Sequence, residues 1–240
     1  MNNPLSEYWG RHYAERHADK ALGDAQRLDF SNERLRFQTY GMILEALGPV
    51  PDRRCLDAGC GLGDIARLLA FLNGRVSAFD LVEDTVKRLR LEYPQIDWFC
   101  GNLEQPPPAE AIGLFDIVVA CEVLQYVDFT KAVTALWRLV APGGRLIGVA
   151  PNAACPIVQR AEARFENHYK GISLADLAAL AAQLPEVGEW GWRGAYFLEN
   201  QSIAPYGLTA WSKEPAGEGG KVPNRLQFVL VRQAANPASA

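Results

Sequence analysis

The residues most able to do chemistry lie in one short run, LDAGCGLGD at positions 56–64, where glycine recurs at every second position. Glycines at 59, 61 and 63 allow a tight turn and leave room for a ligand against the main chain. The helix predicted after the turn points its amino-terminal amides into that space, which suits a carboxylate or a phosphate. Asp57, two residues before the first glycine, adds a negative charge that favours a cationic ligand.

Two cofactors compete for such a turn. Residues 61–66, GLGDIA, fit the dinucleotide pattern G-x-G-x-x-A, and Asp80 lies near the distance expected of a ribose-binding acid. A nicotinamide-dependent oxidoreductase is therefore an open alternative. Asp57 favours S-adenosylmethionine, because its carboxylate would repel a phosphate and would complement ammonium and sulfonium charges.

The elements that must position these residues alternate through the middle of the chain. Apolar segments predict five strands, at residues 55–58, 75–79, 97–100, 115–120 and 145–149, and a sharp turn is predicted at residues 141–144 before the last of them. Helical segments separate them, with Ser31 and Asp128 as predicted caps. This alternation predicts an α/β, Rossmann-like, mostly parallel sheet with helices on both faces. Ligands of such sheets bind at the carboxyl ends of strands, where Asp57 and Asp80 lie.

Beyond Pro151 the alternation stops. We predict a long connection over residues 152–172, a helix capped by Ser173, and a loop rich in glycine and proline over residues 205–223. Two further strands are predicted at residues 191–198 and 226–231.

The glycine-rich run resembles the first motif of the class I S-adenosylmethionine-dependent methyltransferases. Four more stretches follow in the family's order: AFD (78–80), CGNLEQPP (100–107), FDIVVACEVLQYV (115–127) and LVAPGGRLIGVAPN (139–152). Together the motifs cover roughly residues 31–152, and the most similar group is the small-molecule methyltransferases that include ubiquinone-biosynthesis enzymes. The resemblance implies a seven-stranded sheet whose last strand is antiparallel.

The resemblance also implies how the cofactor binds. Gly59, Cys60 and Gly61 would lie along its methionine part, and Asp57 would help to hold the amino group. Asp80 would accept hydrogen bonds from both ribose hydroxyls. There are structural alternatives to these binding roles. Gly59 and Gly61 could be required by the geometry of the turn alone, and Asp80 could be a solvated acid at the end of a strand.

The remaining cofactor contacts come from scattered positions. The resemblance implies that Leu81 and Leu103 sandwich the adenine and that Cys121 offers backbone contact to the methionine part. Asn102 stands where the family usually has an aspartate, and its amide oxygen can still accept the adenine amino hydrogen bond. Arg36 resembles an arginine that grips the cofactor carboxylate in some relatives.

The acceptor side departs from the family pattern. Where relatives often have EVLEHV, residues 122–127 are EVLQYV, so a base carried over from this stretch is in doubt. His168 is the preferred base, with an exposed surface histidine as the alternative. Four residues are predicted to line the substrate pocket: Tyr13, Glu122, Tyr126 and Tyr169.

Composition narrows the classes of function. The net charge of −4, without a basic stripe, argues against a nucleic-acid partner, and no apolar run is long enough for a membrane span. We see no export signal, so the cytoplasm is the expected location. None of the five cysteines forms a C-x-x-C pair, and no metal is predicted.

The sequence therefore predicts a methyltransferase domain at residues 31–233, preceded by a lid segment (1–30) and followed by a disordered tail (234–240), with residues 152–172 covering the substrate. The predicted reaction moves a methyl group from S-adenosylmethionine to a small-molecule hydroxyl and leaves S-adenosylhomocysteine. An amine or carboxylate acceptor, and a binding module without turnover, are alternatives. The acceptor's identity and the oligomeric state stay open.

Overall fold

A computed structural model describes the chain except for residues 1–3, 19–32, 165–168, 197–206, 214–221 and 236–240. The chain divides into two compact units, Met1–Asn102 and Leu103–Ala240. Among the described residues, none of the helices has the length and apolarity that a bilayer crossing requires.

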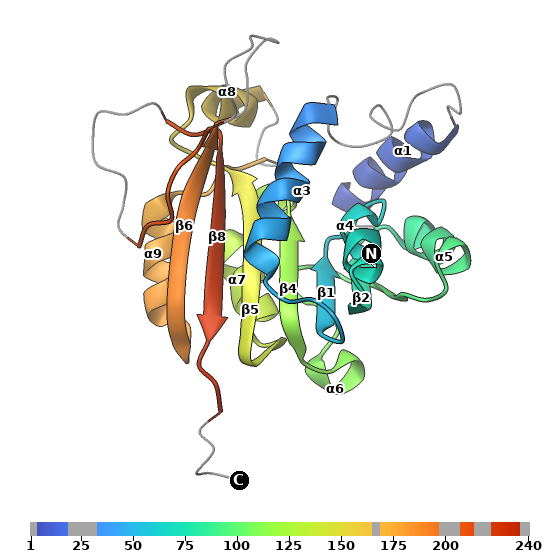
Figure 1. The fold of residues 1–240 in the computed structure, drawn as a ribbon. Helices are drawn as coiled ribbons and strands as arrows, with labels where there is room; N and C mark the ends of the chain where they lie inside the picture. The colour runs from blue at the N-terminus through green and yellow to red at the C-terminus, as the bar shows by residue number, and fades with distance from the viewer. Residues whose placement is uncertain (1–3, 19–32, 165–168, 197–206, 214–221, 236–240) are drawn as a thin grey trace. The chain divides into compact units, whose positions relative to one another are not determined.

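The first unit is built on a parallel sheet with the strand order β3-β2-β1. Figure 1 labels β1 and β2 of this sheet. Its strands are β1 (Arg54–Ala58), β2 (Arg75–Asp80) and β3 (Asp97–Cys100). Its helices are α1 (Pro4–Ala18), α3 (Glu33–Leu47), α4 (Asp64–Phe71) and α5 (Glu83–Glu92). All but the first residue of β1 and of β2 are buried, so their apolar side chains form the core of this unit.

The glycine-rich turn joins β1 to α4 in a conformation that ordinary residues avoid. Gly63 precedes the first residue of α4 with φ of 80°, in the left-handed region. A Cβ added to Gly63 would lie 2.7 Å from Cη2 of Trp98 on β3. Glycine is therefore required here both by the backbone angle and by the indole ring.

Replacing Gly63 with alanine is expected to destabilise the protein by about 2–4 kcal/mol, the sum of the left-handed backbone and the overpacking against Trp98. Calorimetry should record a fall in melting temperature of roughly 5–10 °C. Gly41→Ala is the matched control, because its added Cβ meets nothing within 4 Å inside α3. It should leave the melting temperature unchanged or raise it. Equal melting temperatures for the two variants would contradict this account.

The second unit holds a mixed sheet with the strand order β4-β5-β8-β6-β7. Its strands are β4 (Phe115–Cys121), β5 (Val140–Pro151), β6 (Val187–Tyr196), β7 (Gly207–Leu208) and β8 (Arg225–Arg232). β4 and β5 are parallel, whereas β8 runs antiparallel to both β5 and β6. The last strand is therefore antiparallel, as predicted, and the described residues add the two-residue strand β7 to the seven longer strands.

The helices of this unit are α6 (Ala109–Ile112), the 3-10 helix η1 (Leu124–Tyr126), α7 (Phe129–Trp137), α8 (Pro156–Arg164) and α9 (Leu174–Gln183). The predicted caps are confirmed for α7 and α9: Asp128 accepts from Lys131 N, and Ser173 accepts from Asp176 N. Phe129 meets Phe228 of β8 edge to face, with ring centroids 6.1 Å apart. This contact packs α7 against the sheet.

Three sequence predictions need correction. The connection over residues 152–172 contains the helix α8, which begins at Pro156, a residue well suited to the first helical position. The turn predicted at residues 141–144 lies inside β5, where a shift of register absorbs it. The predicted loop over residues 205–223 contributes β7 and a bridge from Ser212 to Trp192. The glycine and proline content of these segments favours loops and turns. Pairing with a distant strand overrides this preference in β5 and β7, and a local start signal overrides it in α8.

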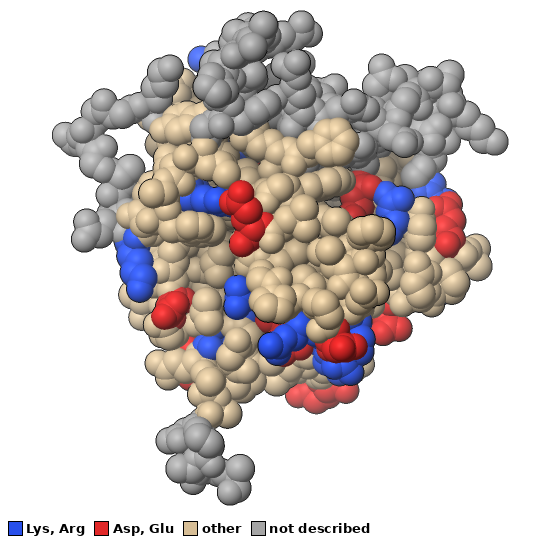
Figure 2. All heavy atoms as spheres, viewed as in Figure 1, with Lys and Arg blue, Asp and Glu red and all other residues tan. Residues whose placement is uncertain are grey.

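Charged residues on the viewed face are mixed in sign. Figure 2 shows basic and acidic side chains in small neighbouring groups among the described residues, and no continuous basic band among them on this face. This distribution agrees with the net charge of −4.

Candidate functional site

Asp57 lies at the carboxyl end of β1 and is almost completely buried, with 2 % of its surface exposed. Its Oδ2 accepts a hydrogen bond of 2.9 Å from the amide of Ala66, in the first turns of α4. Burial, with smaller contributions from the charges of Asp80 and Asp64, raises the pKa of Asp57 to about 8. The side chain therefore favours its neutral form at neutral pH unless a cation comes close.

Asp80 lies at the end of β2, the strand that pairs with β1, and is 6 % exposed. Its Oδ2 accepts from the amide of Gly61 at 2.9 Å, and its Oδ1 accepts from the amide of Val82 at 3.0 Å. One carboxylate thus fixes both the glycine-rich turn and the loop that follows β2.

The glycine-rich turn folds over the end of β2. The amides of Gly59 and Cys60 both donate to the carbonyl of Phe79, at 2.9 and 3.0 Å. Gly59 and Gly61 have φ of 72° and 51°, which only glycine adopts readily. The Cys60 thiol is buried, which raises its pKa and keeps it protonated, so it is a filler and no nucleophile.

Tyr13, predicted for the substrate pocket, lies on α1 against the same turn. Its hydroxyl would be 3.1 Å from a Cβ added to Gly61, so it closely covers the backbone there. Its ring also packs on Trp9, with centroids 5.5 Å apart. The structure thus brings α1 onto the glycine-rich turn.

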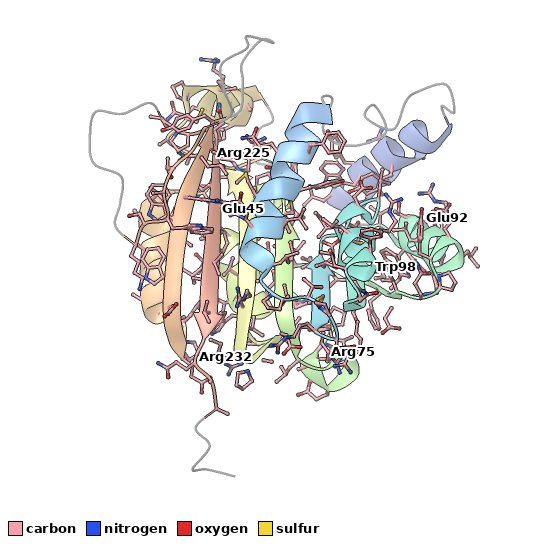
Figure 3. The ribbon with its side chains drawn as sticks, in the orientation of Figure 1. Glu45, Arg75, Glu92, Trp98, Arg225 and Arg232 are labelled. Carbon is pink, nitrogen blue, oxygen red and sulfur yellow. The ribbon has the colours of Figure 1, made fainter. Side chains whose placement is uncertain are left out.

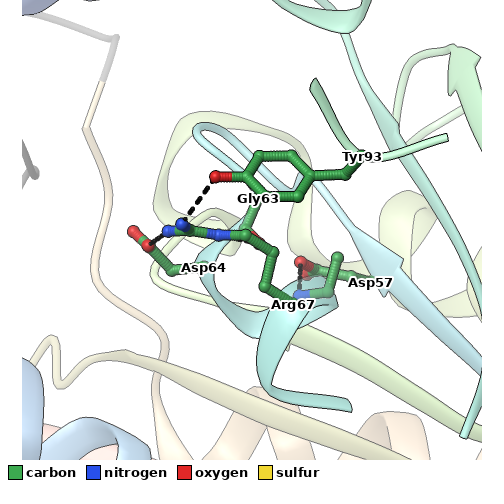
Figure 4. Close-up of polar contacts among 6 residues, drawn as sticks. Asp57, Gly63, Asp64, Arg67 and Tyr93 are labelled. Carbon is green, nitrogen blue, oxygen red and sulfur yellow. Dashed lines mark hydrogen bonds and ion pairs between the residues drawn. The ribbon is translucent and has the colours of Figure 1, made fainter. Parts of the chain in front are cut away.

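The start of α4 is held by a cluster of polar contacts that the sequence analysis did not identify (Figure 4). Arg67 pairs with Asp64, one turn earlier, and donates to the hydroxyl of Tyr93 at 3.0 Å. Its Nε also reaches the carbonyl of Gly63 at 3.3 Å. The i,i+3 spacing of Asp64 and Arg67 was the available signal.

The first unit fits a ligand that has a cationic group and a diol. Asp57 and Asp80 are buried carboxyl groups at the ends of neighbouring strands. Burial and the negative charge of Asp80 both raise the free-energy cost of ionising Asp57. A bound ammonium group would relieve that cost, and the pyrophosphate of a dinucleotide would increase it. These two acidic side chains therefore match S-adenosylmethionine better than a nicotinamide dinucleotide.

The other predicted cofactor residues are dispersed. Leu81 and Asn102 are partly buried in the first unit, at the ends of β2 and β3. Leu103 is buried and Cys121 is partly buried in the second unit. Arg36 falls in α3, but its side chain lies outside the described residues. His168, the predicted base, also lies outside them.

In the second unit, three predicted substrate-pocket residues come together at the carboxyl end of β4. Glu122 follows that strand, and Tyr126 and Tyr169 lie near it with ring centroids 5.8 Å apart. They surround Arg225, whose Nε donates to Oε1 of Glu122 at 2.6 Å. Burial is the main cause that raises the pKa of Tyr169, so this side chain stays a phenol.

Arg225 is the residue that the sequence analysis missed. It is 103 residues from Glu122, and no local pattern connects the two positions. An arginine directly before the apolar core of β8 was the one signal in the sequence. Within the described residues, no group of three or more histidines, cysteines or acids is arranged to hold a metal ion.

Comparison with known proteins agrees with this geometry. Residues 56–148 match the family model of the methyltransferase domain. The chain is 33 % identical over 143 residues to nodulation protein S of Rhizobium tropici, covering 56 % of this chain and 58 % of the relative. It is 37 % identical over 142 residues to a ubiquinone biosynthesis O-methyltransferase of Xanthomonas oryzae pv. oryzae, covering 52 % and 59 %. The chain therefore spans about three fifths of the length of these relatives.

Solved structures show the same fold. The N-methyltransferase NodS of Bradyrhizobium japonicum WM9, in complex with S-adenosylhomocysteine, matches with a TM-score of 0.58 at 20 % identity, covering 92 % of this chain and 98 % of that one. The magnesium protoporphyrin IX methyltransferase of Synechocystis PCC 6803, with bound S-adenosylhomocysteine, matches with a TM-score of 0.61 at 16 % identity, covering 95 % and 98 %. The predicted Rossmann-like fold is thereby confirmed.

Proposed function

We propose that this chain, whose residues 56–148 match the methyltransferase domain model, transfers a methyl group from S-adenosylmethionine to the hydroxyl of a small molecule. The observation that carries the proposal is the pair of buried acids, Asp57 and Asp80, on neighbouring strand ends beside a left-handed glycine turn.

Each acid has a separate role in binding the cofactor. Asp57 holds the cofactor's ammonium group, which supplies the positive charge that its buried carboxyl favours. Asp80 holds the ribose hydroxyls while it keeps its bonds to Gly61 and Val82, because a carboxylate accepts several hydrogen bonds. Gly59, Cys60 and Gly61 offer main chain without large side chains to the methionine part.

We retain the other sequence-based assignments as part of the proposal. Leu81, Leu103 and Asn102 bind the adenine, Cys121 contacts the methionine part and Arg36 binds the carboxylate. Glu122, Tyr126 and Tyr169 line the acceptor pocket, with Tyr13 on the segment that covers the cofactor and His168 as the candidate base.

The close cover of Gly61 by Tyr13 supports a lid function for residues 1–30. The domain spans residues 31–233, residues 152–172 cover the substrate, and the protein acts in the cytoplasm.

The sulfonium supplies the reactive methyl group and a good leaving group, so the protein's main tasks are alignment and exclusion of water. The buried carboxyls hold the donor in one orientation. The phenols and the Glu122–Arg225 pair offer hydrogen bonds to a polar acceptor.

An amine acceptor is the second candidate. It is favoured by the likeness to the N-methyltransferase NodS, whereas the likeness to a ubiquinone biosynthesis O-methyltransferase favours a hydroxyl. The sequence matches to nodulation protein S and to the O-methyltransferase are similar in strength, at 33 % and 37 % identity, and the choice of a hydroxyl rests on the phenols near Glu122.

A thermal-shift titration tests the choice of cofactor. S-adenosylhomocysteine at about 100 times its dissociation constant should stabilise the protein by about 2.7 kcal/mol and raise its melting temperature by several degrees, and NADH should not. Stabilisation by NADH alone would refute the proposal.

Incubation with methyl-labelled S-adenosylmethionine and a cell extract then tests turnover. The label should enter a small molecule whose mass rises by one methylene group. Binding of the cofactor without any transfer would favour a binding module that does not turn over.

A further inference from the structure

Glu122 adopts a backbone conformation that non-glycine residues rarely take, with φ of 54° directly after β4. Its amide donates to the carbonyl of Val149 at 2.8 Å, and its carbonyl accepts from Nε2 of Gln125 at 2.9 Å. Such a conformation costs of order 1 kcal/mol and persists only where the surroundings impose it. These two hydrogen bonds fix the backbone of Glu122, from which its side chain extends.

Arg225 fixes the position of the Glu122 carboxylate. It opens β8, where it lies opposite Pro151 at the end of β5 and Ala195 of β6. Its guanidinium donates to Glu122 through Nε at 2.6 Å and to the carbonyl of Asn224 through Nη1 at 3.3 Å. The side chains of Glu122 and Arg225 are only 10 % and 20 % exposed, so the pair is shielded from competing water.

Among the described residues, the phenols of Tyr126 and Tyr169 interact with the charge of Arg225, and Glu162 and Cys155 interact with Tyr169. Burial, the largest single influence, lowers the pKa of the Arg225 guanidinium, but the attraction and hydrogen bond of Glu122 together with the two tyrosines outweigh burial, so the pKa is raised. A pair of zero net charge, lined by phenols, suits a neutral polar ligand better than an ion. Its place at the carboxyl ends of β4 and β5 is where open α/β sheets bind ligands.

We propose that Arg225 is a positioning residue that holds the Glu122 carboxylate ready to accept a hydrogen bond from the hydroxyl that is methylated. The inference rests on the proposed function and deepens it, because it assigns the acceptor class to a neutral alcohol or phenol. It also gives a role to the arginine at the start of β8.

The role of Glu122 follows from the atoms that move. The acceptor oxygen forms its bond to the methyl carbon while the bond from that carbon to sulfur breaks, and the electron pair goes to sulfur. The acceptor oxygen becomes acidic as it gains the methyl group, and its proton passes along the hydrogen bond to Glu122, which takes the place of His168 as the base, and from there to water.

The kinetic test uses the full chain with labelled S-adenosylmethionine and catechol as the probe acceptor. We expect Glu122→Gln and Arg225→Gln each to lower kcat/KM at least tenfold, with affinity for S-adenosylhomocysteine within twofold of the wild type. The double variant should lose no more than the worse single variant, because the two residues act as one unit. Arg225→Lys should retain an intermediate rate, since it keeps the charge and loses the planar fork.

The pH profile separates positioning from a merely structural role. Without the guanidinium, the buried Glu122 carboxylate loses its counter-charge, which favours its protonated form. The acid limb of kcat/KM should therefore move to higher pH in Arg225→Gln, and this shift should be absent when Glu122→Gln is present as well. A residue needed only for folding would lower the melting temperature and leave the limb in place.

Arg232 provides a matched control at the opposite end of the same strand (Figure 3). It is also 20 % exposed on its side chain and also paired with a glutamate of positive φ, Glu186. Arg232→Gln should leave kcat/KM and the pH profile unchanged.

Several results would overturn the inference. They are an Arg225→Gln variant with the wild-type rate and acid limb, losses that multiply in the double variant, or a wild type loaded with S-adenosylhomocysteine that fails to bind catechol in calorimetry. A wild type that does not bind S-adenosylhomocysteine would instead refute the proposed function itself, so the two failures are distinguishable.

Discussion

Replacing Asp80 with alanine is expected to weaken the binding of S-adenosylhomocysteine by about 100-fold, or about 2.7 kcal/mol. The carboxylate is proposed to accept from both ribose hydroxyls, and hydrogen bonds to charged groups contribute roughly 1.5–3 kcal/mol each. It also accepts from the amides of Gly61 and Val82, so its loss releases the turn that the cofactor lies on. Isothermal titration calorimetry measures the change.

Asp84→Asn is the control for this experiment. Asp84 lies four residues away on α5, and its side chain is 95 % exposed, so its charge can be removed without touching the glycine-rich turn. It should bind S-adenosylhomocysteine like the wild type. Unchanged binding in Asp80→Ala would remove Asp80 from the site.

The second large effect concerns Asp57, whose pKa is raised by burial to about 8. In the free protein this carboxyl is mostly protonated at pH 7, and a bound ammonium group favours its ionised form. Binding at pH 7 should therefore release close to one proton. The affinity for S-adenosylhomocysteine should rise toward tenfold per pH unit between about pH 6 and pH 7. Calorimetry in buffers of different ionisation enthalpy counts the protons.

The raised pKa of Asp57 also determines how the stability of the protein depends on pH. The folded pKa of Asp57 lies above the unfolded value of 3.8, so the folded protein binds more protons between these values. Its contribution to stability is complete below about pH 4 and is lost as the pH rises toward 8. Urea unfolding across this range should show that decline in the wild type.

Asp57→Asn tests both consequences at once. The amide stays neutral, so at pH 7.5 the free variant should be more stable than the wild type by at least about 1 kcal/mol. Its affinity for S-adenosylhomocysteine should fall by at least about tenfold and should become independent of pH. A variant that is less stable and still releases a proton on binding would contradict the role of Asp57.

The glycine-rich site was predictable because its determinants are local. The run at residues 56–64 needs a strand, a left-handed turn and a helix in sequence, and each is set by side chains a few residues apart. Asp80 could be placed because parallel strands end at one edge of a sheet, which brings it beside Asp57. The caps Asp128 and Ser173 were predictable for the same reason, since each satisfies an amide three residues ahead.

Elements after the glycine-rich site were predicted less well. The helix α8 was taken for part of a connection, although Pro156 at its first position was a start signal. The extension of β5 through Ala141–Gly144 depends on pairing with β4, because the backbones of Phe115 and Asp116 lie so close to Gly144 that a side chain would not fit. Turn-forming residues describe the local preference and cannot reveal a partner strand.

By itself, then, the sequence determined the alternation of strands and helices through the middle of the chain, the shape of the glycine-rich turn and the two acids at its rim. Tertiary structure alone decided that Tyr13 covers Gly61 and that Arg225 meets Glu122 across 103 residues of chain. The physical reason is range. Steric limits and hydrogen bonds between near neighbours are written in adjacent residues, whereas the meeting of distant side chains depends on strand register and on which face of an element is turned inward.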